Sequence, residues 1–145
     1  MSKSIPLLEG EVKVSATDPR FLRILRDALS RPPPSVPRVT TVRSVNLSSR
    51  PTKRTVGLTR YFDVRYLMVL SRPVQTITFY SELLDALSDK AAEGVIAHEL
   101  AHAWLNEHVR PEESAEREAE ADKLAREWGF APELDALDQE AETVQ

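Results

Sequence analysis

The stretch that decides the fold of this chain is Val95-Ile96-Ala97-His98-Glu99-Leu100-Ala101-His102-Ala103-Trp104-Leu105. Its apolar composition predicts a buried helix, in which His98 and His102 lie one turn apart, about 6 Å along one face. At that spacing two imidazoles can reach one tetrahedral Zn²⁺ with Zn–N bonds of about 2.0–2.1 Å. Glu99 lies about 100° round the helix from His98, where it can contact a metal-bound water but is not an obvious third ligand. His98 and His102 are therefore candidate zinc ligands, and Glu99 is a candidate general base.

A buried amphipathic helix with two satisfied histidines is the alternative interpretation of this pattern. The surrounding residues argue against it, because Ile96, Leu100 and Trp104 line the opposite side of the helix. Both faces are then apolar except at the two histidines and the glutamate. Buried polar groups need partners, and a metal ion with its water supplies one for all three.

Length and composition set the outer limits of the interpretation. A chain of 145 residues is large enough for one domain with a real core, so we predict a single domain over residues 1–145. The absence of cysteine excludes disulfides and a thiolate zinc site. No apolar run suggests a signal peptide or a membrane span, so we expect a cytoplasmic protein. Residues 1–16 and the acidic tail, 131–145, are expected to be only partly ordered.

The charge is unevenly distributed along the chain. Residues 1–75 contain 14 Lys and Arg against 5 Asp and Glu, whereas residues 76–145 contain 5 against 18. Such asymmetry can mark a nucleic-acid surface, or two faces that attract each other. Because the arginines are dispersed rather than clustered, we favour the second interpretation and do not expect a nucleic-acid partner.

The remaining sequence predicts an α+β fold. An N-terminal helix begins at Asp18-Pro19 and carries an apolar stripe. Four segments predict strands of a small twisted, mostly antiparallel sheet, namely 39–47, 55–62, 64–70 and 74–80. The last of them follows Pro73, which favours an edge position. A short helix at 81–87 precedes the motif helix, which we expect to end near Val109.

A second long helix is predicted from Glu112 to Trp128, closed by Gly129. Its buried face is a continuous arc formed by Leu124, Trp128, Ala121, Ala125 and Glu118. Among the many carboxylates of this helix, Glu118 is the one that continues the buried face, with Asp122 at its edge. Packed on the motif helix, this second helix would therefore present Glu118 to the interior.

A catalytic zinc needs a third protein ligand and an open fourth position. His108 is one candidate, because it lies ten residues after His98, as in the pattern His-Glu-x-x-His-x-x-Gly-x-x-His. That pattern needs a glycine that breaks the helix, and Leu105 stands at its place. In a continuous helix His108 would lie about 15 Å along the axis from His98. Glu118 needs no helix break, so we predict that it is the third ligand.

From Ile77 to Phe130 the sequence resembles the gluzincin zinc metallopeptidases of the CAAX-prenyl-protease and HtpX-like type. The resemblance rests on a strand followed by Glu-Leu-Leu-Asp-Ala-Leu-Ser, Ala-His-Glu-Leu-Ala-His and Arg-Glu-x-x-Ala-Asp. It implies that Glu118 is the third zinc ligand and that Asp122 orients a zinc-bound histidine. The chain departs from the family in having no membrane helices and no family motif in its N-terminal half. It is therefore similar to the short, soluble minigluzincins.

This resemblance implies a zinc-dependent endopeptidase with an extended or unfolded polypeptide as substrate. Glu99 would take a proton from the zinc-bound water, and strand 74–80 would hold the substrate by strand addition. Four residues stay open as the oxyanion stabiliser, namely Tyr61, Tyr66, Tyr80 and Arg126. The cleavage preference and the oligomeric state are not predicted.

Two other functions stay open at this stage. The segment His-Glu-Leu-Ala-His-Ala-Trp-Leu is similar to SprT-like proteases that act on DNA-bound proteins. Their third ligand is a downstream histidine, and this chain has no histidine after His108. The other alternative is a zinc-binding interaction protein without turnover, although metal binding alone gives no reason for a carboxylate at Glu99.

The acidic tail allows two interpretations. Soluble relatives of the minigluzincin kind resemble zymogens whose C-terminal segment crosses the cleft, so the protein could be latent, with a tail carboxylate in zinc's open position. The alternative is a solubilising tail that contacts nothing.

Overall fold

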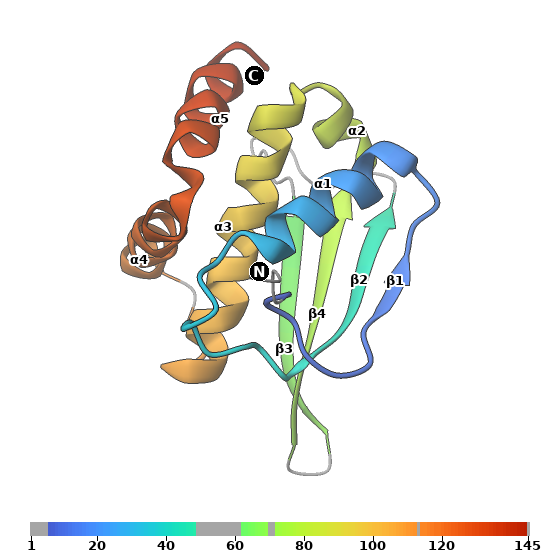
Figure 1. Ribbon diagram of the computed structural model, residues 1–145, viewed down its shortest axis with the longest axis vertical. Helices are drawn as coiled ribbons and strands as arrows, with labels where there is room; N and C mark the ends of the chain where they lie inside the picture. Colours follow the sequence, from blue (N-terminus) through green and yellow to red (C-terminus); the bar gives the residue numbers. More distant parts are fainter. Residues whose placement is uncertain (1–5, 49–61, 70–71, 113, 145) are drawn as a thin grey trace.

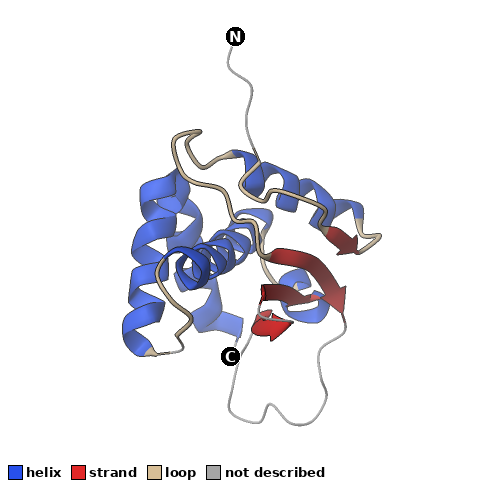
Figure 2. Ribbon diagram, turned by 90° about the horizontal axis from the view of Figure 1, so that it is seen from below, coloured by secondary structure: helices blue, strands red, loops and turns tan. Residues whose placement is uncertain are grey.

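The computed structural model of the chain describes residues 6–48, 62–69, 72–112 and 114–144. Its elements are β1 (Lys13–Ser15), α1 (Pro19–Ser30), β2 (Val42–Ser48), β3 (Phe62–Val69), β4 (Arg72–Tyr80), α2 (Ser81–Asp85), α3 (Asp89–His108), α4 (Ala115–Ala125), a π-helical turn (Arg126–Phe130) and α5 (Ala131–Val144). Figure 1 shows α3 at the centre, between the sheet and the pair formed by α4 and α5. The view from below separates the helices from the sheet (Figure 2). The predicted α+β class is confirmed.

The sheet has the strand order β1-β2-β4-β3. β1 is parallel to β2 and β2 is parallel to β4, whereas β3 and β4 form an antiparallel pair. The sheet is therefore mixed rather than mostly antiparallel. The helical crossover through α1 makes β1 and β2 parallel, since a strand that returns through a helix re-enters in the same direction.

The position of β4 differs from the sequence prediction. β4 lies between β2 and β3, so the expected edge position of strand 74–80 is wrong, and the edges are β1 and β3. Pro73 is tolerated because it is only the second residue of β4 and pairs with Met68 near the end of the ladder. The predicted strand 55–62 lies outside the described residues except for Phe62.

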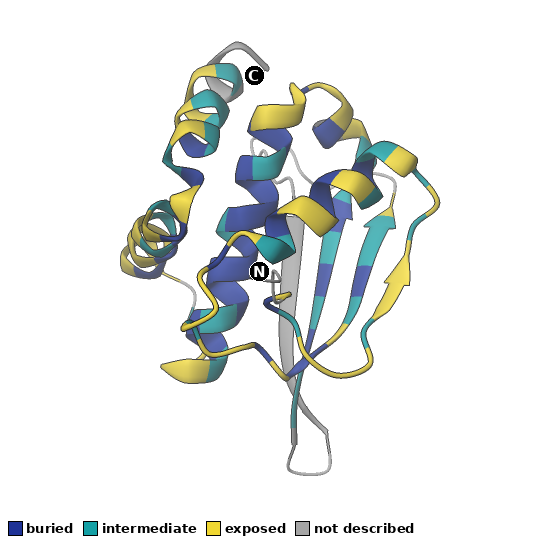
Figure 3. Cartoon of the chain, viewed as in Figure 1, coloured by how far each residue is buried: buried dark blue, intermediate teal, exposed yellow. Residues whose placement is uncertain are grey.

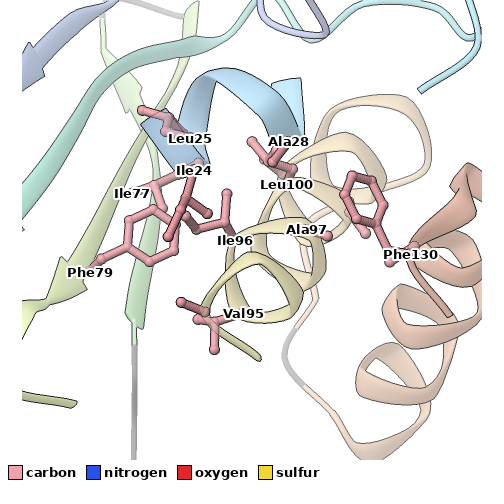
Figure 4. Packing of buried hydrophobic residues seen from close by; sticks show 14 of the residues in the cluster. Ile24, Leu25, Ala28, Ile77, Phe79, Val95, Ile96, Ala97, Leu100 and Phe130 are labelled. Carbon is pink, nitrogen blue, oxygen red and sulfur yellow. The ribbon is translucent and has the colours of Figure 1, made fainter. Parts of the chain in front are cut away.

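The helix α3 is buried on two sides. One apolar cluster joins α1, β4 and α3 and includes Ile24, Ile77, Phe79, Ile96 and Leu100. Figure 4 shows these side chains on one side of α3, while Phe130 approaches Ala97 from the other side. The burial colours of Figure 3 agree, because most of α3 is dark blue whereas the outer faces of α4 and α5 are yellow. No helix in the described ranges is long and apolar enough to cross a membrane.

Local signals place the ends of the helices. Asp18 caps α1 by accepting the N–H of Arg20 at 2.9 Å, and Ser88 caps α3 through the N–H of Ala91 at 3.2 Å. α4 begins at Ala115, three residues later than predicted. Gly129 has a φ of 102°, a left-handed conformation that suits glycine and turns the chain towards α5.

The tail forms the helix α5, which packs on α3. Leu134 of α5 is 1% exposed, and Glu140 accepts hydrogen bonds from the hydroxyl and the N–H of Ser88 at 2.6 and 2.8 Å. Because Glu133 meets Gly94 while Glu140 meets Ser88, α5 runs antiparallel to the first half of α3. A Cβ at Gly94 would lie 2.6 Å from the carbonyl oxygen of Glu133, so only glycine permits this approach.

Candidate metal centre

Two helices bring three ligand groups to one point. His98 and His102 come from α3 and Glu118 comes from the first turn of α4. The Nε2 atoms of the two histidines are 3.2 Å apart. One carboxylate oxygen of Glu118 lies 3.1 Å from Nε2 of His98, and the other lies 2.7 Å from Nε2 of His102. The structure therefore brings together the three residues that the sequence singled out as candidate ligands.

The separations between these atoms fit a tetrahedral metal ion. Ligand atoms at about 2.0–2.1 Å from zinc stand about 3.3 Å from one another at the corners of a tetrahedron. The observed separations of 3.1 and 3.2 Å are close to that edge, and ligand atoms of all three residues lie within 4.8 Å of one another. Two imidazole nitrogens and one carboxylate oxygen are also a donor set that zinc accepts in catalytic sites. The residues present therefore fit the ion.

The site is open on one side. The side chains of His98 and His102 are 14% and 9% exposed, whereas that of Glu118 is 57% exposed. The histidines are thus supplied by the core and the glutamate faces solvent. The exposed position of Glu118 differs from the buried position that the helical stripe predicted.

Electrostatics favour an ionised Glu118. Hydrogen bonds from His102 and then from His98 hold the pKa of the Glu118 carboxyl well below its usual range, although partial burial opposes this shift. The third group is therefore a carboxylate, the form that a metal ion binds.

Glu99 lies on α3 directly after His98 and is fully buried. A carboxylate in this position is shielded from bulk water. Its role as general base stays a prediction.

His108 is placed away from the metal centre. α3 continues without a break to His108, as Leu105 predicted. The Nε2 atom of His108 lies 3.1 Å from the carbonyl oxygen of Arg38 and 3.2 Å from the carboxylate of Glu107. Its ring also packs against Trp104, with centroids 4.6 Å apart. His108 therefore belongs to a contact between the end of α3 and the segment before β2.

Asp122 has a partner on its own helix. Its carboxylate accepts a hydrogen bond from Nε of Arg126 at 2.7 Å, and Arg126 also donates to Asp135 of α5 at 2.9 Å. The hydrogen bonds to Asp122 and then to Asp135 raise the pKa of Arg126 above its usual range. Asp122 thus links α4 to α5, and its contact with a metal-bound histidine stays a prediction.

The candidates for the oxyanion stabiliser are only partly visible. Tyr61 lies outside the described residues, and of Tyr66 only the backbone is described. Tyr80 is half-buried at the end of β4, and Arg126 is engaged by the aspartates.

Four tail carboxylates have partners outside the three candidate ligands. Glu133 pairs with Arg31 at 3.0 Å, Asp135 and Asp138 pair with Arg126 at 2.9 and 3.6 Å, and Glu140 binds Ser88. A latent form held by a tail carboxylate stays a prediction. The side chain of Glu142 is not described.

A buried polar chain beside the site was missed from the sequence. Arg117, Asn106 and Gln75 are all buried and bonded to one another in series. The signal for Arg117 was available, because it lies four and eight residues before Ala121 and Ala125 on the buried stripe of α4. Arginine is mostly exposed in proteins, so its residue type alone does not indicate burial.

Comparison with known families gives one match. Residues 68–117 match the model of peptidase family M48, a match consistent with a gluzincin metallopeptidase. The matched segment contains His98, Glu99 and His102 and ends at Arg117, one residue before Glu118. No curated protein and no solved structure gives a match.

Proposed function

We propose that the protein is a zinc-dependent endopeptidase that hydrolyses peptide bonds of extended or unfolded polypeptides. His98, His102 and Glu118 hold the metal ion, and Glu99 is the general base. The observation that carries the proposal is the convergence of the two Nε2 atoms with the Glu118 carboxylate, at 3.1 and 2.7 Å. The match of residues 68–117 to peptidase family M48 supports the same reaction class.

The roles of the residues follow from their positions. A zinc ion held by these residues would lower the pKa of its bound water to about 7 and would polarise the scissile carbonyl. Glu99 accepts the proton of the attacking water and returns it to the leaving amine. Because Glu118 faces solvent while the two histidines are largely buried, the substrate reaches the centre from its solvent-exposed side.

We further propose that the substrate adds as a strand to β3. β3 is the edge of the described sheet on the side of β4, and α3 packs against it. An edge strand offers its outer backbone N–H and C=O groups to an extended chain. Strand 74–80, which the sequence suggested for this role, cannot take it, because it pairs with β2 on one edge and with β3 on the other.

Proteolysis of an unfolded protein, with zinc present, tests the proposal. We expect cleavage by the wild-type chain and its loss in Glu99→Gln, with zinc content unchanged because Glu99 is not a ligand. His108→Ala is the control, since its ring lies at the Arg38 contact, and it should keep both zinc and activity. Zinc binding without cleavage in the wild type would instead indicate a non-catalytic zinc-binding protein.

A further inference from the structure

A buried arginine that the proposed chemistry does not use stands next to Glu118. The side chain of Arg117 is 1% exposed. Its guanidinium donates to the carbonyl oxygen of Arg110 at 2.7 Å, to Oδ1 of Asn106 at 3.4 Å and to the carboxylate of Glu120 at 3.1 Å. One side chain thus joins α4 to the end of α3 and to the segment that follows α3.

This contact extends into the sheet. Asn106 donates from its amide to Oε1 of Gln75 at 3.1 Å, and Gln75 is fully buried in β4. The amide of Gln75 in turn donates to the hydroxyl of Thr41 and to the carbonyl oxygen of Ala103, each at 2.9 Å. Arg117 therefore binds to a rigid, satisfied polar network rather than to mobile surface groups.

α4 has few large apolar contacts to determine its orientation. Apart from Arg117, its fully buried residues are Ala121 and Ala125, and Leu124 adds one larger side chain that is only partly buried against the core. Figure 1 looks almost along α4 while α3 runs up the picture, so the two helices cross steeply instead of lying side by side. Glu118 itself is 57% exposed and contributes no packing.

We propose that Arg117 is a positioning residue for the metal centre, which fixes the rotation of α4 and so holds the Glu118 carboxylate at His98 and His102. Neighbouring residues of a helix are separated by about 100°. Fixing the direction of the Arg117 side chain therefore also fixes the direction in which Glu118 leaves the helix. This inference rests on the proposed function, because it assumes that Glu118 is a metal ligand.

The role is geometric rather than electrostatic. A positive charge near a metal site opposes the binding of a cation. Here that charge is offset by Glu120 at 3.1 Å and by Glu112 at 4.0 Å. Arginine is suited to the task because its planar guanidinium holds several acceptors at once, which a lysine ammonium cannot do in the same geometry.

Binding of Co²⁺ to the full chain, followed by its visible absorption spectrum, tests the proposal alongside the melting temperature of the metal-free form. Arg117→Met should weaken Co²⁺ binding about 10–100-fold, as for loss of other groups that orient ligands. Its spectrum should move towards that of Glu118→Ala. Arg117→Lys keeps the charge but has a single donor nitrogen, so its affinity for Co²⁺ should be intermediate. If Arg117→Met does not fold, the affinity of Arg117→Lys tests the proposal instead.

Arg31→Met is the matched control. Arg31 also bridges helices, pairing with Glu93 at 3.2 Å and Glu133 at 3.0 Å, but it lies at the junction with α5. Its loss should lower the melting temperature and leave the affinity and the spectrum of Co²⁺ unchanged. Wild-type affinity in every Arg117 variant that folds, or an equal loss in Arg31→Met, would overturn the role of Arg117. No binding by the wild-type chain would instead overturn the metal centre, and this role with it.

Discussion

The central helix α3 makes two junctions of opposite character. Its first half meets α5 through apolar and closely packed groups, with Leu134 buried and Gly94 against the backbone of Glu133. Its second half meets α4 through polar contacts, with Glu118 at the histidines and Arg117 at Asn106. The junction with α5 stabilises the fold, whereas the junction with α4 builds the metal centre.

The difference has a thermodynamic consequence. Apolar burial stabilises α5 whether or not a ligand is present. α4 buries two alanines besides Arg117 and partly buries Leu124, so its position depends more than that of α5 on polar contacts and, when a metal ion is bound, on the ion. We therefore expect metal to stabilise α4 selectively, and each prediction below tries to separate the two junctions.

Metal removal should have the largest effect. Free zinc at about 1,000 times its dissociation constant stabilises a protein by about 4 kcal/mol, and chelation removes this contribution. Hydrogen exchange should show that the amides of α4 lose protection on chelation, while those of α5 change little. Equal loss of protection in both helices would contradict the claim that the metal ion stabilises α4 selectively.

Removing a buried side chain from the α5 junction should lower stability without weakening metal binding. Leu134→Ala removes a buried side chain and should lower the free energy of unfolding of the metal-free form by about 2–5 kcal/mol. Denaturant unfolding measures this loss, and zinc affinity in native conditions should stay within a few-fold of wild type. Helix propensity does not contribute to this loss, since alanine is a better helix former than leucine. A large loss of zinc affinity in Leu134→Ala would mean that the junctions are coupled.

Much of the site could be predicted because its signals are local. The spacing of His98 and His102 and the cap at Ser88 each depend on a few neighbouring residues. The predicted buried position of Glu118 was wrong, since Glu118 is 57% exposed and Arg117 lies on the buried stripe instead. The sheet order could not be predicted, because the alternation in strand 74–80 shows which residues are buried but not which strands lie on either side. Pro73 favours an edge strand by its residue type, and this led to the wrong position for strand 74–80.

The packing of the tail also depends on residues remote in the sequence. The acidic residues of α5 are spread along the helix and its helical pattern is weak, so the pattern alone does not predict where it packs. Its helix is stabilised by distant partners, since Gly94 admits its backbone and Arg31 binds both Gly129 and Glu133. Burial of Arg117 likewise depends on Asn106 and Gln75, which are remote in the sequence.

Asp122 should have a smaller effect that concerns the α4 junction. Asp122→Asn should weaken zinc binding or slow turnover about 10–100-fold while the fold survives, as for other carboxylates that orient a metal ligand. Asp135→Asn removes the α5 partner of the same Arg126 and is the matched control. Equal zinc affinity and rate in wild type and Asp122→Asn would reduce Asp122 to its ion pair with Arg126.

Glu140 should have the smallest effect. Hydrogen bonds from the hydroxyl and then the N–H of Ser88 lower the pKa of the Glu140 carboxyl. A lowered pKa means that the stabilisation is present above the unfolded-state pKa and is lost as the pH falls through the folded-state pKa. Glu140→Gln should therefore cost less than about 1 kcal/mol at neutral pH. The gap to wild type, measured by unfolding at several pH values, should close in acid, whereas a gap that widens in acid would contradict this contact.

Zinc stoichiometry of the purified chain and of Glu118→Ala tests the central claim most directly, with His108→Ala measured beside them. Two helices must contribute to one ion if the claim is correct. We predict about one zinc per wild-type chain, a loss of zinc in Glu118→Ala and full occupancy in His108→Ala. Full occupancy in Glu118→Ala together with loss in His108→Ala would contradict the account and place the third ligand on α3.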